Sequence, residues 1–198
     1  MSSTNQVGLI LFVSKSELSV CYWNIGSAKD KFDKTNLVRS LSRHDLIFVS
    51  EIKSSGDLYM NGYVQYRCTL TDRYVNRGGL CLFVRNSLVS FVKNVTYDGD
   101  DAIWIEFGHI RDIVFGGTYI PPSDSPYFDE TLFANLQEKI RTLFNGKNVV
   151  IGGDMNSRVG HYQSLSLHGT MYTTYHPSDD AFTNRSGRLL RSLYDDNC

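Results

Sequence analysis

The sequence predicts a single α/β domain built on mixed β-sheets. Short runs rich in β-branched and aromatic residues dominate the chain, and segments with helical periodicity separate some of them. Several runs are apolar throughout, which is typical of central strands that are covered on both faces. This order of segments favours layers of helix–sheet–sheet–helix or of helix–sheet–helix, and the pattern leaves both open.

Length and composition agree with one folded domain. The chain has 198 residues, of which 41% are apolar, and no linker, repeat or low-complexity tract divides it. Twenty basic residues nearly balance twenty-one acidic ones, so a partner held only by bulk positive charge is not indicated. The four cysteines show no CxxC spacing, and two of them, Cys21 and Cys81, lie in apolar runs, which favours buried thiols over disulfides.

Nine strands are expected from their β-rich composition. They cover residues 7–13, 18–24, 46–50, 63–67, 79–84, 89–95, 102–107, 112–119 and 148–153. The first, VGLILFV, lacks a basic region before it and is too short to span a bilayer, so it predicts a strand and not a signal or an anchor. We therefore expect residues 1–17 to form an extension carrying an extra strand, and residues 18–198 to form the domain.

Three helices are expected between or after these strands, within residues 31–43, 128–145 and 189–194. In the second, apolar residues recur four apart and share one face: Leu132, Leu136, Ile140 and Phe144. Asp129 is suited to cap its start and Gly146 to end it.

Polar side chains follow four of the predicted strands. Asn24 and Glu51 come directly after two early strands, Tyr119 ends a later one, and Asp154 and Asn156 follow the strand NVVIGG. In α/β sheets, ligands bind beyond the carboxyl ends of strands, so these side chains are candidates for one site. Each one is also explained as an ordinary turn residue, and spacing alone does not prove that they converge.

The chemistry of this set points to phosphate ester hydrolysis. Oxygen ligands without clustered His or Cys favour a hard cation such as Mg²⁺. A carboxylate that does not bind the metal can activate water, and an amide and a phenol can orient an anionic oxygen. Together they fit metal-assisted hydrolysis.

The sequence does not match the motifs of several other kinds of site. The segment DMNSRVG begins like a calcium loop, but Arg158 takes a ligand position, Val159 replaces the required glycine, and Leu165 stands where a glutamate is needed. Neither the phosphate-loop motif nor the G-x-S-x-G nucleophile motif is present, and the five histidines lack metal-ligand spacing.

Five ordered blocks carry a family resemblance: WNI at 23–25, SE at 50–51, RGGLCLFVRNSL at 77–88, GTYIPPS at 117–123 and GGDMNSRVG at 152–160. In this order they resemble the endonuclease/exonuclease/phosphatase superfamily. The Tyr-x-Pro-Pro-Ser and Gly-Asp-x-Asn-Ser-Arg blocks look like the apurinic-endonuclease-like domains of non-LTR retrotransposons. The resemblance spans roughly residues 18 to 197.

The resemblance implies a fold, a function and a role for each candidate. The fold would be a four-layer α/β sandwich of two mixed β-sheets flanked by helices, DNase I-like, and the activity that of a divalent-metal-dependent DNA endonuclease. Glu51 would bind Mg²⁺ or Mn²⁺ with Asn24 beside it, and Tyr119 would contact the scissile phosphate. Asp154 would position or deprotonate the attacking water. Asn156 would help to orient that water, since residues two apart in an extended segment point the same way.

The resemblance implies DNA as the partner and no membrane. The implied location is intracellular, with the nucleus as one candidate compartment. Members of the superfamily end with an Asp-His pair on late strands, whereas this chain ends at Asp195-Asp196-Asn197-Cys198. We therefore expect a domain that lacks its last strands, with little nicking activity and low solubility. The alternative function is an inactive remnant that binds nucleic acid or protein. A phosphatase acting on lipid or inositol phosphates is a third possibility, which the YIPPS block disfavours.

Overall fold

The computed structural model describes residues 6–13, 16–28, 31, 35–54, 57–67, 78–99, 101–109, 113–160 and 182–195. The chain divides into two compact units. The first comprises Met1–Tyr119 with Gly146–Asp154, and the second Ile120–Asn145 with Met155–Cys198. Each unit is described by itself below.

The first unit contains a five-stranded mixed sheet. In spatial order its strands are β1 (Gln6–Val13), β2 (Ser16–Asn24), β3 (Leu46–Ser50), β5 (Leu80–Arg85) and β4 (Tyr63–Arg67). β2 and β3 are parallel, and the other neighbours are antiparallel. Helix α1 (Thr35–Leu41) lies between β2 and β3 in the chain, as a crossover between parallel strands requires.

The same unit contains a four-stranded mixed sheet. Its strands, in spatial order, are β6 (Val92–Asp98), β7 (Ala102–Phe107), β8 (Ile113–Tyr119) and β9 (Asn148–Asp154), with only β8 and β9 parallel. The strand expected at 89–95 begins later, at Val92, because the short helix α2 (Asn86–Val89) takes up the residues after β5. The predicted α/β class with two mixed sheets is confirmed.

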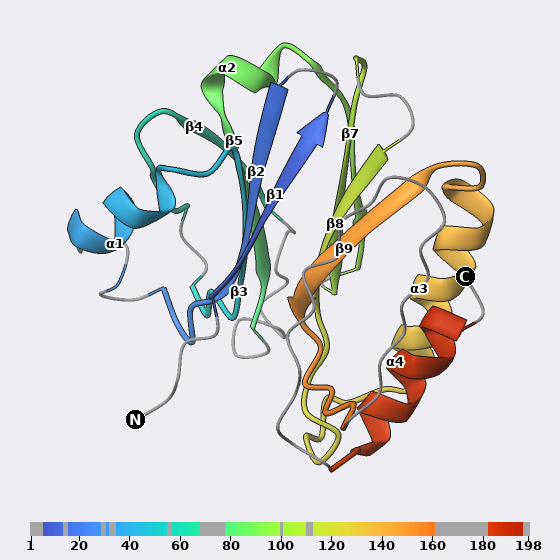
Figure 1. Ribbon diagram of the computed structural model, residues 1–198. Coiled ribbons are helices and arrows are strands. Elements are labelled where there is room, and N and C mark those ends of the chain that lie inside the picture. Colours follow the sequence, from blue (N-terminus) through green and yellow to red (C-terminus); the bar gives the residue numbers. More distant parts are fainter. Residues whose placement is uncertain are drawn as a thin grey trace. The chain divides into compact units, whose positions relative to one another are not determined.

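The two sheets face each other across an apolar core (Figure 1). Alternate residues of each strand enter it, as the two-residue period of a strand dictates. The ring of Tyr22 on β2 stacks on that of Phe48 on β3, with centroids 5.0 Å apart. Gly117 and Gly152 of the opposite sheet leave room for these rings, since a Cβ would stand 2.1 Å from Phe48 and 2.6 Å from Tyr22.

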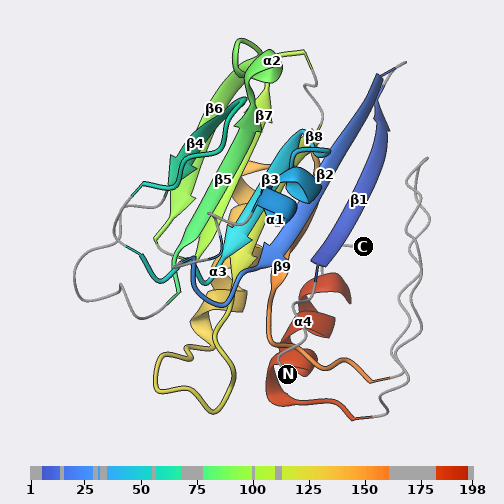
Figure 2. The same ribbon diagram turned by 90° about the vertical axis from the view of Figure 1, so that its left-hand side faces the viewer.

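A second apolar cluster covers the other face of the five-stranded sheet, where α1 packs (Figure 2). Leu41 of α1 is buried there, together with the Cys21 and Cys81 thiols. Because both faces are covered, β3 and β5 are apolar along nearly their whole length.

The second unit contains helices α3 (Thr131–Leu143) and α4 (Arg185–Asp195), which contact each other. Asp129 accepts a hydrogen bond from the amide of Thr131 (2.9 Å), but the N-cap position of α3 is Glu130, whose side chain makes no capping bond. Phe133 is buried beside Leu136, although the four-residue spacing had favoured Leu132. None of the helices that the structure describes is long and apolar enough to cross a membrane.

Candidate functional site

Three of the candidate side chains continue the inward-facing rows of core residues. Val20 and Tyr22 belong to the core, and Asn24 is the next inward position of β2. By the same two-residue period, Asp154 follows Gly152 on β9, and Tyr119 is itself part of the core. Polar groups therefore replace apolar ones where these strands end.

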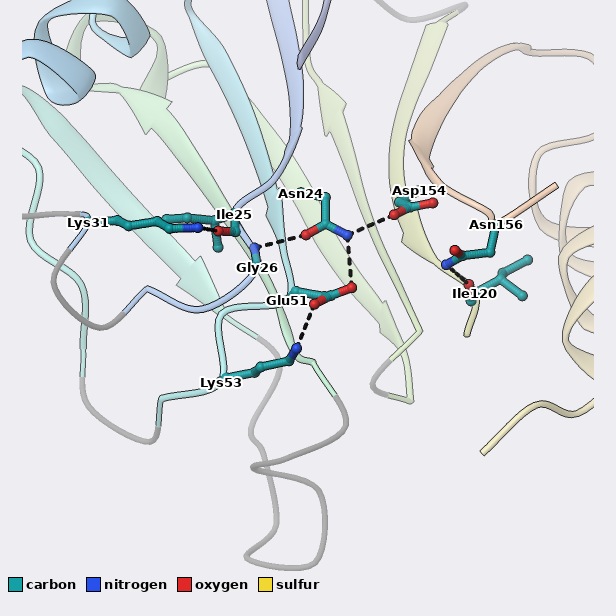
Figure 3. Close-up of polar contacts among 9 residues, drawn as sticks. All are labelled: Asn24, Ile25, Gly26, Lys31, Glu51, Lys53, Ile120, Asp154 and Asn156. Atoms are coloured by element: carbon teal, nitrogen blue, oxygen red, sulfur yellow. Dashed lines mark hydrogen bonds and ion pairs between the residues drawn. The ribbon is translucent and has the colours of Figure 1, made fainter. Parts of the chain in front are cut away.

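The amide of Asn24 joins the two carboxylates of the set. Its Nδ2 donates to Oε1 of Glu51 (2.9 Å) and to Oδ2 of Asp154 (2.7 Å), while its Oδ1 accepts from the amide of Gly26 (2.9 Å) (Figure 3). The Gly26 contact fixes which end of the amide carries the donors. One side chain thus holds together acids that lie 103 positions apart and come from the two sheets.

Glu51 occupies a strained backbone position directly after β3. Its φ is 54°, in the left-handed region that residues other than glycine rarely adopt. Neighbouring loops hold it there, because its carbonyl accepts from the amide of Ser27 (2.7 Å) and the amide of Lys53 donates to Gly78 O (2.8 Å). The turn directs the carboxylate of Glu51 toward Asn24 (Figure 3).

Lys53 compensates the charge of Glu51. Its ammonium lies 2.6 Å from Oε2 of Glu51, with 40% of the Lys53 side chain exposed. Burial raises the pKa of Glu51, but hydrogen bonds from Lys53 and Asn24, the Lys53 charge and a hydrogen bond from Tyr119 outweigh it, so the pKa is lowered. Glu51 is therefore ionised at neutral pH.

Tyr119 lies opposite Asp154 in the parallel pairing of β8 with β9. Burial raises its pKa, and the negative charges of Glu51 and Asp154 and a hydrogen bond to Glu51 raise it further. The phenol therefore stays protonated at neutral pH and acts as a donor. A Cβ at Gly78 would stand 3.1 Å from the Tyr119 ring, so this glycine leaves little room for the ring to move.

The two glycines before Asp154 have different structural roles. Gly152 faces the ring of Tyr22, and Gly153 has a φ of 141°, where a Cβ would stand 1.9 Å from the carbonyl oxygen of Thr118. No other residue type fits Gly153 without moving β8 or β9. The pair thus packs the strands together and sets the exit from β9, on which the position of Asp154 depends.

Asn156 belongs to the second unit. β9 ends at Asp154, and Asn156 has a φ of 46°, so the assumption of an extended segment from 154 to 156 was wrong. The side-chain Nδ2 of Asn156 donates to the carbonyl oxygen of Ile120 (2.8 Å) (Figure 3).

The donors around Asn24 suit a hard divalent cation. Within the described ranges, no group of three or more His, Cys, Asp or Glu side chains is placed to hold a metal ion. Mg²⁺ needs fewer protein ligands, since it takes one or two carboxylates and completes its shell with water and phosphate oxygens. Glu51 fits that requirement. The Asn24 oxygen could join it only after the amide turns, because its Nδ2 faces the carboxylates and its Oδ1 accepts from Gly26. The nitrogen and sulfur ligands of a zinc site are missing from the set.

Two of the residues around this set were missed from the sequence. Lys53 contacts Glu51 only because both have positive φ (48° and 54°), which local sequence does not signal. Gly78 comes close to the ring of Tyr119 through the packing of distant strands. Of the five histidines, the structure describes two: His44 hydrogen-bonds Ser19, and His109 packs on Phe91.

Comparisons with known proteins identify the family. The sequence model of the group described as "Endonuclease/Exonuclease/phosphatase family" matches residues 21–190, which include all five candidates. A search of curated proteins by sequence found no match.

Solved structures share the fold at low sequence identity. An AP endonuclease from Archaeoglobus fulgidus is 15% identical with a TM-score of 0.60, and the match covers 90% of this chain and 70% of that protein. The AP endonuclease LMAP from Leishmania major is 14% identical with a TM-score of 0.61, and the match covers 87% of this chain and 64% of that protein. The endonuclease domain of TRAS1, a telomere-specific non-LTR retrotransposon, is 13% identical with a TM-score of 0.55, and the match covers 89% of this chain and 69% of that domain. The chain thus spans about two thirds of the length of these proteins.

Proposed function

This chain belongs to the endonuclease/exonuclease/phosphatase family, and from that premise we propose that it is a divalent-metal-dependent phosphodiesterase that nicks DNA. The observation that carries the proposal is the pairing of Glu51 and Asp154 through the amide of Asn24. DNA is favoured as the substrate because the similar structures include AP endonucleases and a retrotransposon endonuclease domain.

The two carboxylates suit different tasks. Glu51 has a lowered pKa and stays charged, which suits a ligand for Mg²⁺ or Mn²⁺. Asn24 is proposed as a second ligand, through its oxygen, once its amide has turned away from Gly26. A bound cation would supply charge neutralisation at the phosphate. Asp154, on the other side of Asn24, is the general base that accepts a proton from the attacking water.

Two neutral groups are given further roles in the proposed reaction, Tyr119 of the first unit and Asn156 of the second. The hydroxyl of Tyr119 stays protonated, so it can turn from Glu51 to donate to a non-bridging phosphate oxygen. Asn156 is proposed to orient the attacking water. Its left-handed backbone and its bond to Ile120 O restrict the orientation of its amide.

The ion pair between Lys53 and Glu51 favours a second candidate, a nucleic-acid-binding module without catalysis. The ammonium engages an oxygen that a metal ligand would need. Binding of a cation to Glu51 therefore requires Lys53 to turn away, which its exposed side chain allows. In the second candidate Lys53 stays on Glu51 and no cation binds.

Relaxation of supercoiled plasmid by the full chain distinguishes the nicking enzyme from the binding module without catalysis. The pairing of Glu51 and Asp154 through Asn24 leads us to replace the sequence-based expectation of little nicking. We now expect nicking with Mg²⁺ or Mn²⁺, none after chelation with EDTA, and recovery when the metal is restored. Glu51→Gln and Asp154→Asn should each lower the rate by about a hundredfold or more. Glu138→Gln is the matched control, because it neutralises an exposed acid on α3 that pairs with Arg141.

Two results would count against the proposal. Nicking that persists in Glu51→Gln and Asp154→Asn would show that another protein or another site cuts the plasmid. DNA binding without nicking in either metal would support the second candidate instead.

A further inference from the structure

The loop that follows Asp154 is fastened at several points by one residue of the second unit, Asn184. The side-chain Nδ2 of Asn184 donates to the carbonyl oxygen of Asn156 (2.8 Å), and its Oδ1 accepts from the amide of Arg158 (3.0 Å). The backbone amide of Asn184 also donates to Arg158 O (3.1 Å). These three bonds span 26 or 28 positions of the sequence and hold both ends of the segment 156–158.

Asn184 is also the cap of α4. Its Oδ1 accepts from the amide of Gly187 (2.7 Å), as a helix cap does three residues before its donor. A Cβ at Gly187 would stand 2.0 Å from Arg158 O, so the loop lies against the first turn of α4 only because this residue is glycine. Capping alone would need the oxygen of Asn184 and not its Nδ2.

We propose that Asn184 is a positioning residue, which fixes the left-handed backbone of Asn156 and thereby the orientation of its amide. Asn156 has a φ of 46°, a conformation that costs energy for residues with a side chain, although less for asparagine than for most. Asn184 offsets that cost by holding the Asn156 carbonyl, while the side chain of Asn156 is held on Ile120 O. This inference rests on the proposed role of Asn156 in catalysis.

Asn184→Asp removes the bond from the side-chain nitrogen of Asn184 to the Asn156 carbonyl and keeps the others. Aspartate caps a helix as well as asparagine does, so the bonds to Arg158 and Gly187 are kept. The second carboxylate oxygen would face the Asn156 carbonyl, where an N–H donor is needed, and would repel it. We expect kcat to fall by about tenfold to a hundredfold with KM changed little, because a small misplacement of a reacting group has such an effect.

The reciprocal change at the other helix is the matched control. Asp129→Asn exchanges acid for amide just before α3, in the same unit, and keeps the acceptor for the Thr131 amide. It should leave kcat unchanged. Asn184→Asp should also lose its effect on kcat in an Asn156→Ala background, whereas a general loss of stability would lower kcat in both backgrounds.

NMR measurement of φ at Asn156 tests the inference without any activity. Asn184→Asp should move Asn156 out of the left-handed region, and Asp129→Asn should leave it there. An unchanged φ at Asn156 in Asn184→Asp would overturn the inference, whether or not the chain nicks DNA. If φ of Asn156 changes in Asn184→Asp but the wild-type chain does not nick DNA, Asn184 still positions the backbone of Asn156 and the proposed function is wrong.

Discussion

At the scale of single residues, the candidate site depends on groups that are neutral as much as on its acids. Asn24 satisfies both carboxylates with one amide, and Tyr119 remains protonated beside two negative charges. Neutral donors of this kind stabilise negative charge that develops on a phosphate without adding to the charge of the ground state. The phenol is therefore a sensitive place to test the proposed chemistry.

Tyr119→Phe should keep the fold and lower kcat for plasmid nicking by about a hundredfold, because it removes one oriented donor and no packing. Tyr63→Phe is the control, since its hydroxyl also bonds within the first unit, to His44 O at 2.5 Å, away from the proposed site. Equal kcat values for Tyr119→Phe and the wild type would exclude the phenol from the reaction.

At the scale of elements, a polar cluster holds the starts of β2 and β3. Asp45 accepts from Arg85 (2.7 Å) and from the amide of Ser19 (3.0 Å), and Ser19 Oγ lies 2.7 Å from Nδ1 of His44. Arg85 also donates to the carbonyl oxygens of Ser42 and His44. The cluster lies at the strand ends opposite to those that carry Asn24 and Glu51.

The cluster makes the free energy of unfolding depend on pH through His44. Burial lowers the pKa of His44, Asp45 raises it, and Arg85 and Arg43 lower it, with a net lowering from 6.5. The folded state therefore binds fewer protons than the unfolded state below that pH. The stabilisation is present above the unfolded pKa and is lost as the pH falls toward the folded pKa.

Thermal unfolding between neutral pH and about pH 5 measures this effect. His44→Gln should flatten the decline in stability, by less than about 1 kcal/mol because the ring is only partly buried and solvent screens its charge. His109→Gln, on the surface of the same unit, should leave the wild-type profile in place. Parallel profiles for His44→Gln and the wild type would rule out His44 as the cause.

At the scale of the whole molecule, the core between the sheets supports the ends of the strands. Phe48 is 2% exposed and packs on Tyr22, on the strand that carries Asn24. Phe48→Ala should lower the free energy of unfolding by about 3–5 kcal/mol, measured by urea denaturation. Phe91→Ala, at a side chain that is 47% exposed, should cost much less. Similar losses for the two variants would mean that the core does not dominate the stability of the first unit.

Strand and helix positions followed from the sequence because hydrophobic periodicity is local. Eight predicted strands match β2 to β9 in order, and the helix expected at 189–194 lies within α4. The one displaced strand start, at Val92, follows a short helical turn that the apolar run had concealed. Asn24, Glu51 and Asp154 could be placed at strand ends from the sequence, because the change from apolar to polar residues shows where a strand ends.

By itself, the sequence determined the α/β class, the oxygen-rich character of the candidate set and the residues that compose it. The tertiary structure decided that Asn24 bonds Asp154 across 130 positions, and that Lys53 neutralises Glu51. It also decided the left-handed backbones of Glu51 and Asn156, and the hold of Asn184 on the loop after β9. The physical reason is the same in each case. Strand pairing and sheet packing bring distant residues together and offset local strain, and neither effect is encoded in neighbouring residues alone.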